Sequence, residues 1–225
     1  MRRNEMALSI AIDGPAGAGK STIAKRVADS LNIVYVDTGA MYRAIALYMI
    51  RTKTDVNEEL SVCAALTDVK IDVVFKDGTQ ALLLNGEDVN AFIRTPEVSE
   101  AASIVSSYGP VREKLVAEQR RLAQNTDMIM DGRDIGTCVL PNASLKIYLT
   151  ASSAVRAKRR YLELAAAGSE CDLDEIQRGI EERDERDMNR EISPLRKADD
   201  AKLIDSSYMT IDEVVEQILL YVRRL

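Results

Sequence analysis

Residues 10–22 have the sequence Ile-Ala-Ile-Asp-Gly-Pro-Ala-Gly-Ala-Gly-Lys-Ser-Thr, and this stretch decides the fold. It matches the phosphate-binding pattern G-x-x-x-x-G-K-[ST] in full, from Gly14 to Ser21. An apolar run at 7–12 precedes it and has the length of a buried strand. After it, apolar residues recur at helical spacing, at Ile23, Ala24, Val27, Ala28 and Leu31. A glycine-rich loop between a strand and a helix is the context in which this pattern binds polyphosphate.

Each residue type in this loop has a physical task. The glycines let the backbone take positive φ angles and turn its N–H groups toward a polyphosphate, at the positive end of the following helix. Lys20 is expected to reach the β- and γ-phosphates, and the Ser21 hydroxyl to bind the Mg²⁺ that accompanies the nucleotide. The alternative is a glycine-rich turn whose Lys and Ser only face solvent. The full match favours a nucleotide site formed by Gly14, Pro15, Ala16, Gly17, Ala18, Gly19, Lys20, Ser21 and Thr22.

The composition limits the class of protein. With 225 residues, 46% of them apolar, the chain can form one large domain. We expect no membrane span and no signal peptide, and three widely spaced cysteines favour a cytoplasmic protein without disulfides or zinc. The net charge of −6 argues against non-specific binding to nucleic acid. Because the chain has no histidine, its chemistry must use Arg, Lys, Asp and Mg²⁺.

A second expected strand, at 33–36, ends in the sequence Asp-Thr-Gly-Ala-Met-Tyr-Arg at 37–43. Ligands of α/β sheets bind at the ends of strands. Thr38 is expected to cap the next helix, and Arg43 lies about one turn into that helix. A hydroxyl and a guanidinium group could therefore converge on one anion. An ordinary helix cap with a solvated arginine explains the spacing equally well.

From 71 to 92 the pattern changes to a β-meander. Asp77-Gly78 and Asn85-Gly86 lie between apolar runs and are typical of hairpin turns. A parallel core is not built this way, so we expect a small inserted subdomain, bounded by Pro96 and preceded by a helix at about 58–66. Two helices are then expected at 97–107 and 111–123, separated by Gly109-Pro110.

An apolar strand at 128–130 ends in Asp131-Gly132-Arg133-Asp134. An acidic residue after such a strand resembles a Walker B element, which holds Mg²⁺ directly or through water. A Mg²⁺ site needs only the acidic residue, whereas this stretch has three charged residues beside Gly132. Arg133 and Asp134 are therefore expected to recognise a ligand.

The next expected strand, at 145–149, leads to a helix that carries Arg156, Arg159 and Arg160 and ends near Gly168. A further helix begins at Asp172 and continues into the charged run 181–190. A charged run is commonly a solvated helix face. Two arginine-bearing helices joined by a small-residue loop instead suggest a lid that closes over phosphates. A strand at 202–205 and an amphipathic helix at 211–221 complete the sheet and its cover.

Four stretches together resemble the bacterial cytidylate kinases, a family of nucleoside monophosphate kinases, and the resemblance covers nearly the whole chain. They are residues 12–20, 37–43, 131–137 and 182–190. The resemblance implies an α/β, P-loop NTPase-like three-layer fold with a five-stranded parallel sheet in the order 2-3-1-4-5. It further implies one domain, 1–225, with a core at about 7–57, 104–152 and 193–225, a β-rich monophosphate-binding insert at about 58–103 and a short lid at about 153–192.

The same resemblance implies an activity. It is the ATP-dependent phosphorylation of CMP and dCMP to CDP and dCDP, with Mg²⁺, by a monomeric cytoplasmic enzyme of pyrimidine metabolism that needs neither nucleic acid nor membrane. The acceptor is a phosphate oxygen that is already anionic, so no general base is required. Catalysis then consists of aligning two phosphates, neutralising their charge and excluding water.

The family's residue roles carry over to matching positions. The implied catalytic residues are Lys20, Arg133, Arg183 and Arg190. Arg156 and Arg160 would join the loop in binding ATP, and Ser21 would bind Mg²⁺ with Asp131, the latter through water. Thr38, Arg43, Arg133 and Arg190 would hold the acceptor phosphate, Arg183 and Asp187 the sugar and its phosphate, and Ser103, Arg112 and Asp134 the cytosine.

Two alternatives remain open. One is a P-loop kinase for another small acceptor, such as shikimate or dephospho-coenzyme A, against which the cytosine-matching arginine and aspartate argue. The other is a regulatory nucleotide switch. A switch GTPase requires Asp-x-x-Gly after a strand, which this chain lacks, and the guanine-reading pattern at 52–55 follows an expected helix rather than a strand.

Overall fold

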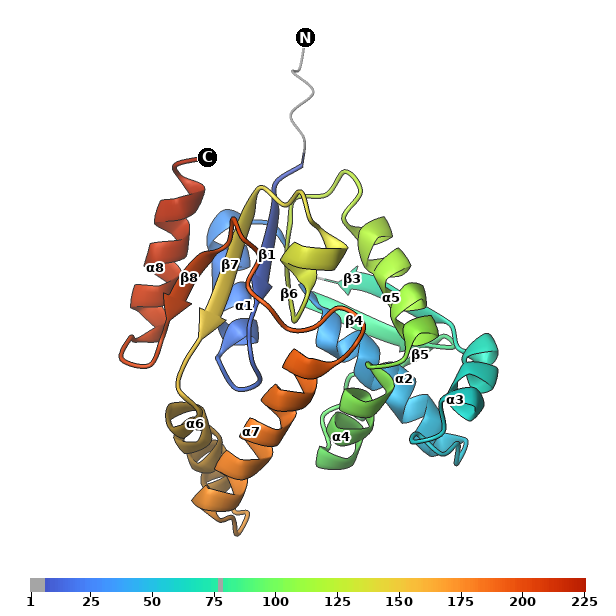
Figure 1. Ribbon diagram of the computed structural model, residues 1–225. Helices are drawn as coiled ribbons and strands as arrows, with labels where there is room; N and C mark the ends of the chain where they lie inside the picture. Colours follow the sequence, from blue (N-terminus) through green and yellow to red (C-terminus); the bar gives the residue numbers. More distant parts are fainter. Residues whose placement is uncertain (1–6, 77–78) are drawn as a thin grey trace. The chain divides into compact units, whose positions relative to one another are not determined.

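The computed structural model describes residues 7–76 and 79–225 (Figure 1). The elements up to residue 105 are β1 (Ser9–Asp13), α1 (Lys20–Leu31), β2 (Val34–Asp37), α2 (Thr38–Arg51), α3 (Glu59–Ala65), the 3₁₀ turn η1 (Leu66–Asp68), β3 (Ile71–Lys76), β4 (Thr79–Leu84), β5 (Glu87–Asp88) and α4 (Pro96–Val105). They are followed by α5 (Gly109–Leu122), β6 (Met128–Gly132), the π-helical turn η2 (Ile135–Val139), β7 (Leu145–Thr150), α6 (Ser153–Ala166), α7 (Leu173–Asn189), β8 (Lys202–Asp205) and α8 (Ile211–Val222).

The strands form one five-stranded sheet and one three-stranded sheet. The order of the larger sheet is β2-β6-β1-β7-β8. When its strands are numbered along the chain this order is 2-3-1-4-5, as predicted. The smaller sheet, β3-β4-β5, is antiparallel and corresponds to the predicted β-rich insert.

The chain forms two compact units. Unit 1 comprises the described residues up to Ile33 together with Asn125–Leu225, and unit 2 comprises Val34–Gln124. In unit 1, β1 pairs in parallel with β6 and β7, and Asp13 lies opposite Gly132 and Tyr148 in register. β1 and β6 therefore end at the same level, and β7 continues from Tyr148 to Thr150. In an α/β sheet their carboxyl ends form the edge at which ligands bind.

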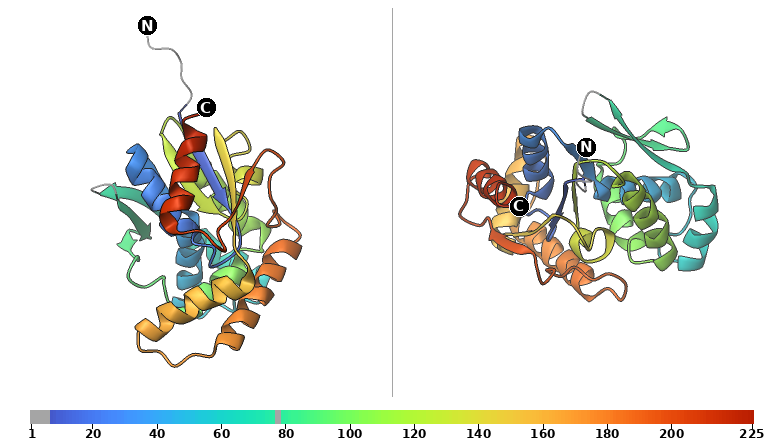
Figure 2. Two further views of the ribbon diagram at one scale, coloured as in Figure 1. Left: turned by 90° about the vertical axis from the view of Figure 1, so that its left-hand side faces the viewer. Right: turned by 90° about the horizontal axis from the view of Figure 1, so that it is seen from above.

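The core of unit 1 is built on the central strands. Ile10, Ile12, Ile129 and Met130 have no exposed surface, as expected for parallel strands covered on both faces. Helix α1 packs on β1 and β6 and lies beside α8 (Figure 2). Arg26 of α1 forms an ion pair with Asp212 of α8 at 2.6 Å.

Unit 2 has its own core between α2, α4, α5 and the small sheet. Met41, Ile45, Leu82 and Leu115 are fully buried in it. The hairpin predicted at Asn85-Gly86 is confirmed, because the two residues have φ angles of 50° and 87° and join β4 to β5. The turn predicted at Asp77-Gly78 lies outside the described residues.

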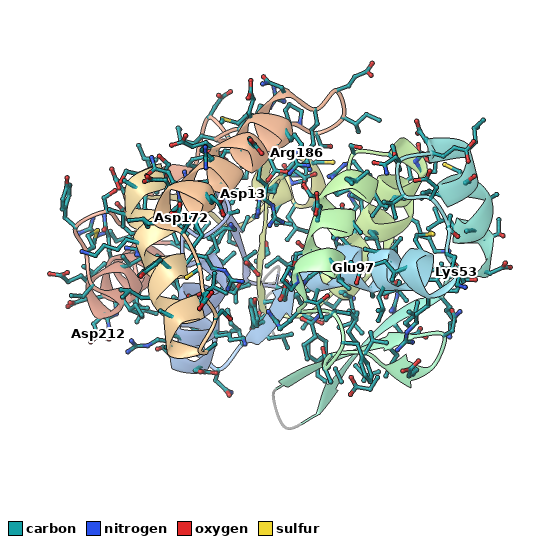
Figure 3. All side chains as sticks on the ribbon, turned by 90° about the horizontal axis from the view of Figure 1, so that it is seen from below. Asp13, Lys53, Glu97, Asp172, Arg186 and Asp212 are labelled. Atoms are coloured by element: carbon teal, nitrogen blue, oxygen red, sulfur yellow. The ribbon has the colours of Figure 1, made fainter. Side chains whose placement is uncertain are left out.

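Local side-chain caps begin several of the helices. Asp172 caps α7 by accepting the Glu175 N–H at 2.8 Å (Figure 3), and Gly168, with φ of 77°, follows the end of α6 as predicted. The prediction that Thr38 caps α2 is wrong. Asp37 is the cap, and its carboxylate accepts the Ala40 N–H at 2.8 Å, because Thr38 is already the first helical residue.

Within residues 7–76 and 79–225, no helix combines the length and the apolar character that crossing a membrane requires.

Candidate functional site

The loop between β1 and α1 is shaped by its glycines. Gly14 has φ of 150°, and a Cβ atom placed there would lie 1.9 Å from the carbonyl oxygen of Leu149, so no other residue fits. Gly17 and Gly19 also have positive φ angles, of 75° and 85°. Gly19 is the N-cap of α1, and the first turn of that helix contains no acidic residue. The positive end of α1 is therefore left for an anion.

Lys20 is buried beneath this loop. Its Nζ atom donates to the Pro15 carbonyl at 2.8 Å, and the residue is 6% exposed. Burial and the Arg133 guanidinium group lower the pKa of Lys20 to about 7, and the carboxylates of Asp131 and Asp187 oppose the shift. An anionic phosphate near Nζ would favour the charged form. The positive charge near Nζ therefore favours an anionic ligand.

Two oxygen donors suited to Mg²⁺ lie beside the loop. The Ser21 hydroxyl donates to Asp131 Oδ2 at 3.0 Å, and Asp131 is 5% exposed. Hydroxyl and carboxylate oxygens fit a hard cation that retains several waters and phosphate ligands. Among the residues that the structure describes, no group of three or more His, Cys, Asp or Glu could hold a metal alone. Ser21 and Asp131 could hold such a cation together with phosphate oxygens.

Unit 1 also brings Arg133 and Asp134, which follow β6, together with Asp187 of α7 and with Arg190 directly after that helix. Arg133 Nε donates to Asp187 Oδ2 at 2.8 Å, and Arg190 Nη2 lies 3.6 Å from Asp134 Oδ1. Burial alone would raise the pKa of Asp187, but the arginines at 133, 183 and 190 hold it below the usual range. Asp187 is therefore held as a carboxylate among guanidinium groups. Guanidinium groups can donate to an anion, and a carboxylate can accept a hydroxyl hydrogen.

The two arginines expected to bind ATP differ in environment. Arg156 is 5% exposed and donates to the carbonyls of Ala151 and Ala16 at 2.8 and 2.9 Å, while Nη2 pairs with Asp184 at 2.6 Å. It thus ties the phosphate-binding loop to α7. Arg160 is half-exposed and pairs with Glu163 at 3.2 Å on the surface of α6.

The remaining predicted residues lie in unit 2. Arg43 Nη2 donates to Asp37 Oδ2 at 3.0 Å, and Arg94 contacts the same oxygen at 3.1 Å. Thr38, 2% exposed, follows Asp37 at the start of α2. The Nε atom of Arg43 is buried without a hydrogen-bond partner. A donor of this kind suits a phosphate oxygen.

Of the two unit 2 residues expected to contact the base, Arg112 is buried, and Ser103 is partly buried with a buried Oγ atom. The Ser103 Oγ atom has no hydrogen-bond partner. Arg112 is 3% exposed, donates to the Ser106 carbonyl at 3.2 Å and lies over the Tyr42 ring, with its guanidinium carbon 5.6 Å from the ring centroid. A buried hydroxyl without a partner is a group that a ligand would satisfy.

The structure therefore places the predicted residues in two sets. Unit 1 contains the loop, Ser21, Asp131 and the Arg133–Asp187 and Arg190–Asp134 pairs, whereas unit 2 contains Thr38, Arg43, Ser103 and Arg112. Sequence analysis did not single out Asp13, Asp37, Arg94 or Asp184. For Asp13 and Asp37 a signal was available, because an acidic residue at the end of a strand lies at the ligand-binding edge. Arg94 and Asp184 gave no such signal.

Residues 10–224 match the family model described as cytidylate kinase. The chain is 50% identical over 211 residues to a cytidylate kinase of Lactobacillus johnsonii, covering 94% of this chain and 92% of the relative. It is also 50% identical over 215 residues to a cytidylate kinase of Desulforamulus reducens, covering 96% of each chain. A crystal structure of an uncharacterized protein from Eubacterium ventriosum has a TM-score of 0.52 at 12% identity, covering 96% of this chain and 98% of that one. At that identity the likeness shows the fold alone.

Proposed function

Because the chain belongs to the cytidylate kinase family, we propose that it transfers the γ-phosphoryl group of ATP directly to the phosphate of CMP and dCMP. The products are ADP with CDP or dCDP, and the process belongs to pyrimidine nucleotide metabolism. One observation carries the proposal beyond the family match. Unit 1 places a phosphate-binding loop within electrostatic range of a second cluster of arginines, since Arg133 and Arg183 both lower the pKa of Lys20.

Transfer needs no general base. The attacking atom is an oxygen of the CMP phosphate, which is anionic at neutral pH, and the chain contains no histidine. The protein's task is to neutralise and align two polyanions that repel each other. Lys20 neutralises the phosphates of ATP, while Arg133 and Arg190 hold the acceptor phosphate, with Arg183 beside them. When bound, Mg²⁺ supplies further neutralisation of the nucleotide phosphates, and Ser21 and Asp131 would hold it.

In this proposal Thr38 and Arg43 contact the phosphate of the acceptor nucleotide, and Arg183 and Asp187 contact its sugar and its phosphate. Ser103, Arg112 and Asp134 satisfy the donor and acceptor groups of cytosine. The support is that Ser103 Oγ and Arg43 Nε are buried without partners, while Asp134 is held by Arg190. The roles of Arg156 and Arg160 toward ATP, and closure of 153–192 as a lid, belong to the same proposal.

We further propose that the protein works as a cytoplasmic monomer, without nucleic acid or membrane. The three cysteines are free, as expected for a reducing compartment, and the net charge of −6 opposes non-specific binding to nucleic acid. Sedimentation velocity at micromolar concentration tests the monomer, because a species of twice the chain mass contradicts it.

The activity is tested by measuring ADP release from ATP and Mg²⁺ with CMP, dCMP, UMP, AMP, GMP or no acceptor, in parallel. We expect the highest rates with CMP and dCMP, and stoichiometric CDP or dCDP by chromatography. Shikimate and dephospho-coenzyme A, added as further acceptors, test for a kinase of another small molecule. ADP release that is independent of acceptor, or highest with a non-cytosine acceptor, contradicts the proposal.

A further inference from the structure

Asp13 is joined to the backbone of η2 by two short hydrogen bonds. It is the last residue of β1, directly before the phosphate-binding loop, and it is 4% exposed (Figure 3). Its Oδ1 atom accepts the Ile135 N–H and its Oδ2 atom accepts the Gly136 N–H, each at 2.7 Å. These donors directly follow Asp134. One side chain at the start of the loop therefore holds the backbone beside the proposed acceptor-binding residues.

The peptide group that follows Asp134 is held on both its carbonyl and its N–H side. Its carbonyl accepts the N–H groups of Cys138 and Val139, at 2.8 and 3.2 Å, and these bonds start the π-helical turn. The carboxylate of Asp134 faces Arg190 at 3.6 Å. Because the N–H groups that follow Asp134 are bound to Asp13, the direction of its side chain depends on the Asp13 carboxylate.

Gly136 makes the short approach possible. A Cβ atom at this position would lie 3.3 Å from Asp13 Oδ2 and 3.1 Å from the Cδ atom of Lys146. A methyl group there would push against the Asp13 carboxylate. The methyl group would have little room to move away, because the Lys146 side chain lies close to it as well. Gly136→Ala is therefore an independent way to disturb the same contact while retaining the carboxyl group of Asp13.

We propose that Asp13 is a positioning residue for acceptor recognition, which directs Asp134 and Arg133 by binding the N–H groups at the start of η2. The inference rests on the proposed function, since it takes Asp134 and Arg133 to bind CMP. Asp13 acts through these residues. A change at Asp13 therefore alters acceptor affinity and base selectivity more than it alters the use of ATP.

The experiment compares Asp13→Asn and Gly136→Ala with the wild type. Asparagine retains one acceptor oxygen but presents an N–H group to the other backbone donor, so one of the two bonds is lost. We expect the KM for CMP to rise about ten-fold in Asp13→Asn, and the ratio of kcat/KM for CMP over UMP to fall about ten-fold. The KM for ATP should change less than about two-fold. Gly136→Ala should change the KM for CMP and the ratio of kcat/KM for CMP over UMP in the same directions, by smaller factors.

Asp127→Asn is the matched control. Asp127 lies before β6 and accepts the Leu8 N–H at 2.6 Å, so it joins the same two strands at their opposite end. This variant should retain the CMP-to-UMP ratio of the wild type. A merely structural role of Asp13 would lower the melting temperature and the active fraction, and would reduce rates with both acceptors equally.

The outcomes separate this inference from the proposed function. A wild type that does not phosphorylate CMP refutes the function and with it the premise of the inference. A wild type active on CMP, with an unchanged CMP-to-UMP ratio in folded Asp13→Asn, refutes only the inference. If Asp13→Asn does not fold, Gly136→Ala decides, and an unchanged ratio in that variant overturns the inference.

Discussion

Asp13 makes the free energy of unfolding depend on pH in a defined window. Burial raises the pKa of its carboxyl group from 3.8 to about 6, although the N–H groups of Gly136 and Ile135 oppose the shift. In the unfolded chain the carboxyl group keeps its ordinary pKa. The folded protein therefore holds one more proton than the unfolded chain between about pH 4 and pH 6.

The sign and the size of the pH effect on the free energy of unfolding follow from this difference in pKa. Since the folded-state pKa is the higher one, ionisation of Asp13 disfavours folding above about pH 6, and the cost disappears as the pH falls toward 4. A shift of about two pKa units corresponds to about 3 kcal/mol at pH 7. Within the window, the contribution of Asp13 changes by at most about 1.4 kcal/mol per pH unit, which is the limit for one proton.

The assay is urea unfolding of the wild type and of Asp13→Asn between pH 4 and pH 8. Asparagine does not titrate, so the wild type should gain about 2.4 kcal/mol relative to the variant as the pH falls from 7 to 4. The hydrogen bond lost in the variant offsets the two curves by a constant and leaves their relative slope unchanged. Parallel curves across the window would mean that Asp13 ionises in the folded protein as it does in the unfolded chain, and would refute the argument.

Four further results are expected. Lys20→Ala should fold, by circular dichroism, yet lose activity by orders of magnitude, because Lys20 acts on charge that develops during transfer; wild-type turnover would contradict its role. Arg133→Ala and Arg190→Ala should each lower kcat/KM by about a thousand-fold but lower the free energy of unfolding by only about 1–3 kcal/mol. A large fall in melting temperature with unchanged kcat/KM would indicate a structural role. Asp134→Asn should lower the ratio of kcat/KM for CMP over UMP by roughly ten- to a hundred-fold, mainly because kcat/KM for CMP falls. An unchanged ratio would exclude base recognition by this residue. Gly14→Ala should lower the free energy of unfolding, measured with denaturant, by about 3 kcal/mol or more, since its Cβ would lie 1.9 Å from the Leu149 carbonyl oxygen. Wild-type stability would mean that the loop can move away from that oxygen.

The sequence by itself determined those features that a few adjacent residues dictate. Backbone sterics explain why the loop at Gly14–Ser21, the turn at Asn85-Gly86 and the end of α6 at Gly168 were all predictable. Side-chain reach explains the cap at Asp172, which binds an N–H group three residues away. The strand order also followed from the sequence, but through the family resemblance, since local patterns do not specify which strands become neighbours.

Only the tertiary structure decided which charged groups meet. Asp13 binds N–H groups more than 120 residues away, a contact set by the parallel register of β1 with β6. The buried placement of Arg156 against Ala16 and Asp184 depends on how α6 packs against α7. In unit 2, Asp37 pairs with Arg94, which lies 57 residues further along the chain. The physical reason is that a carboxylate pairs with whichever donors folding brings within about 3 Å, and sequence spacing does not record that distance.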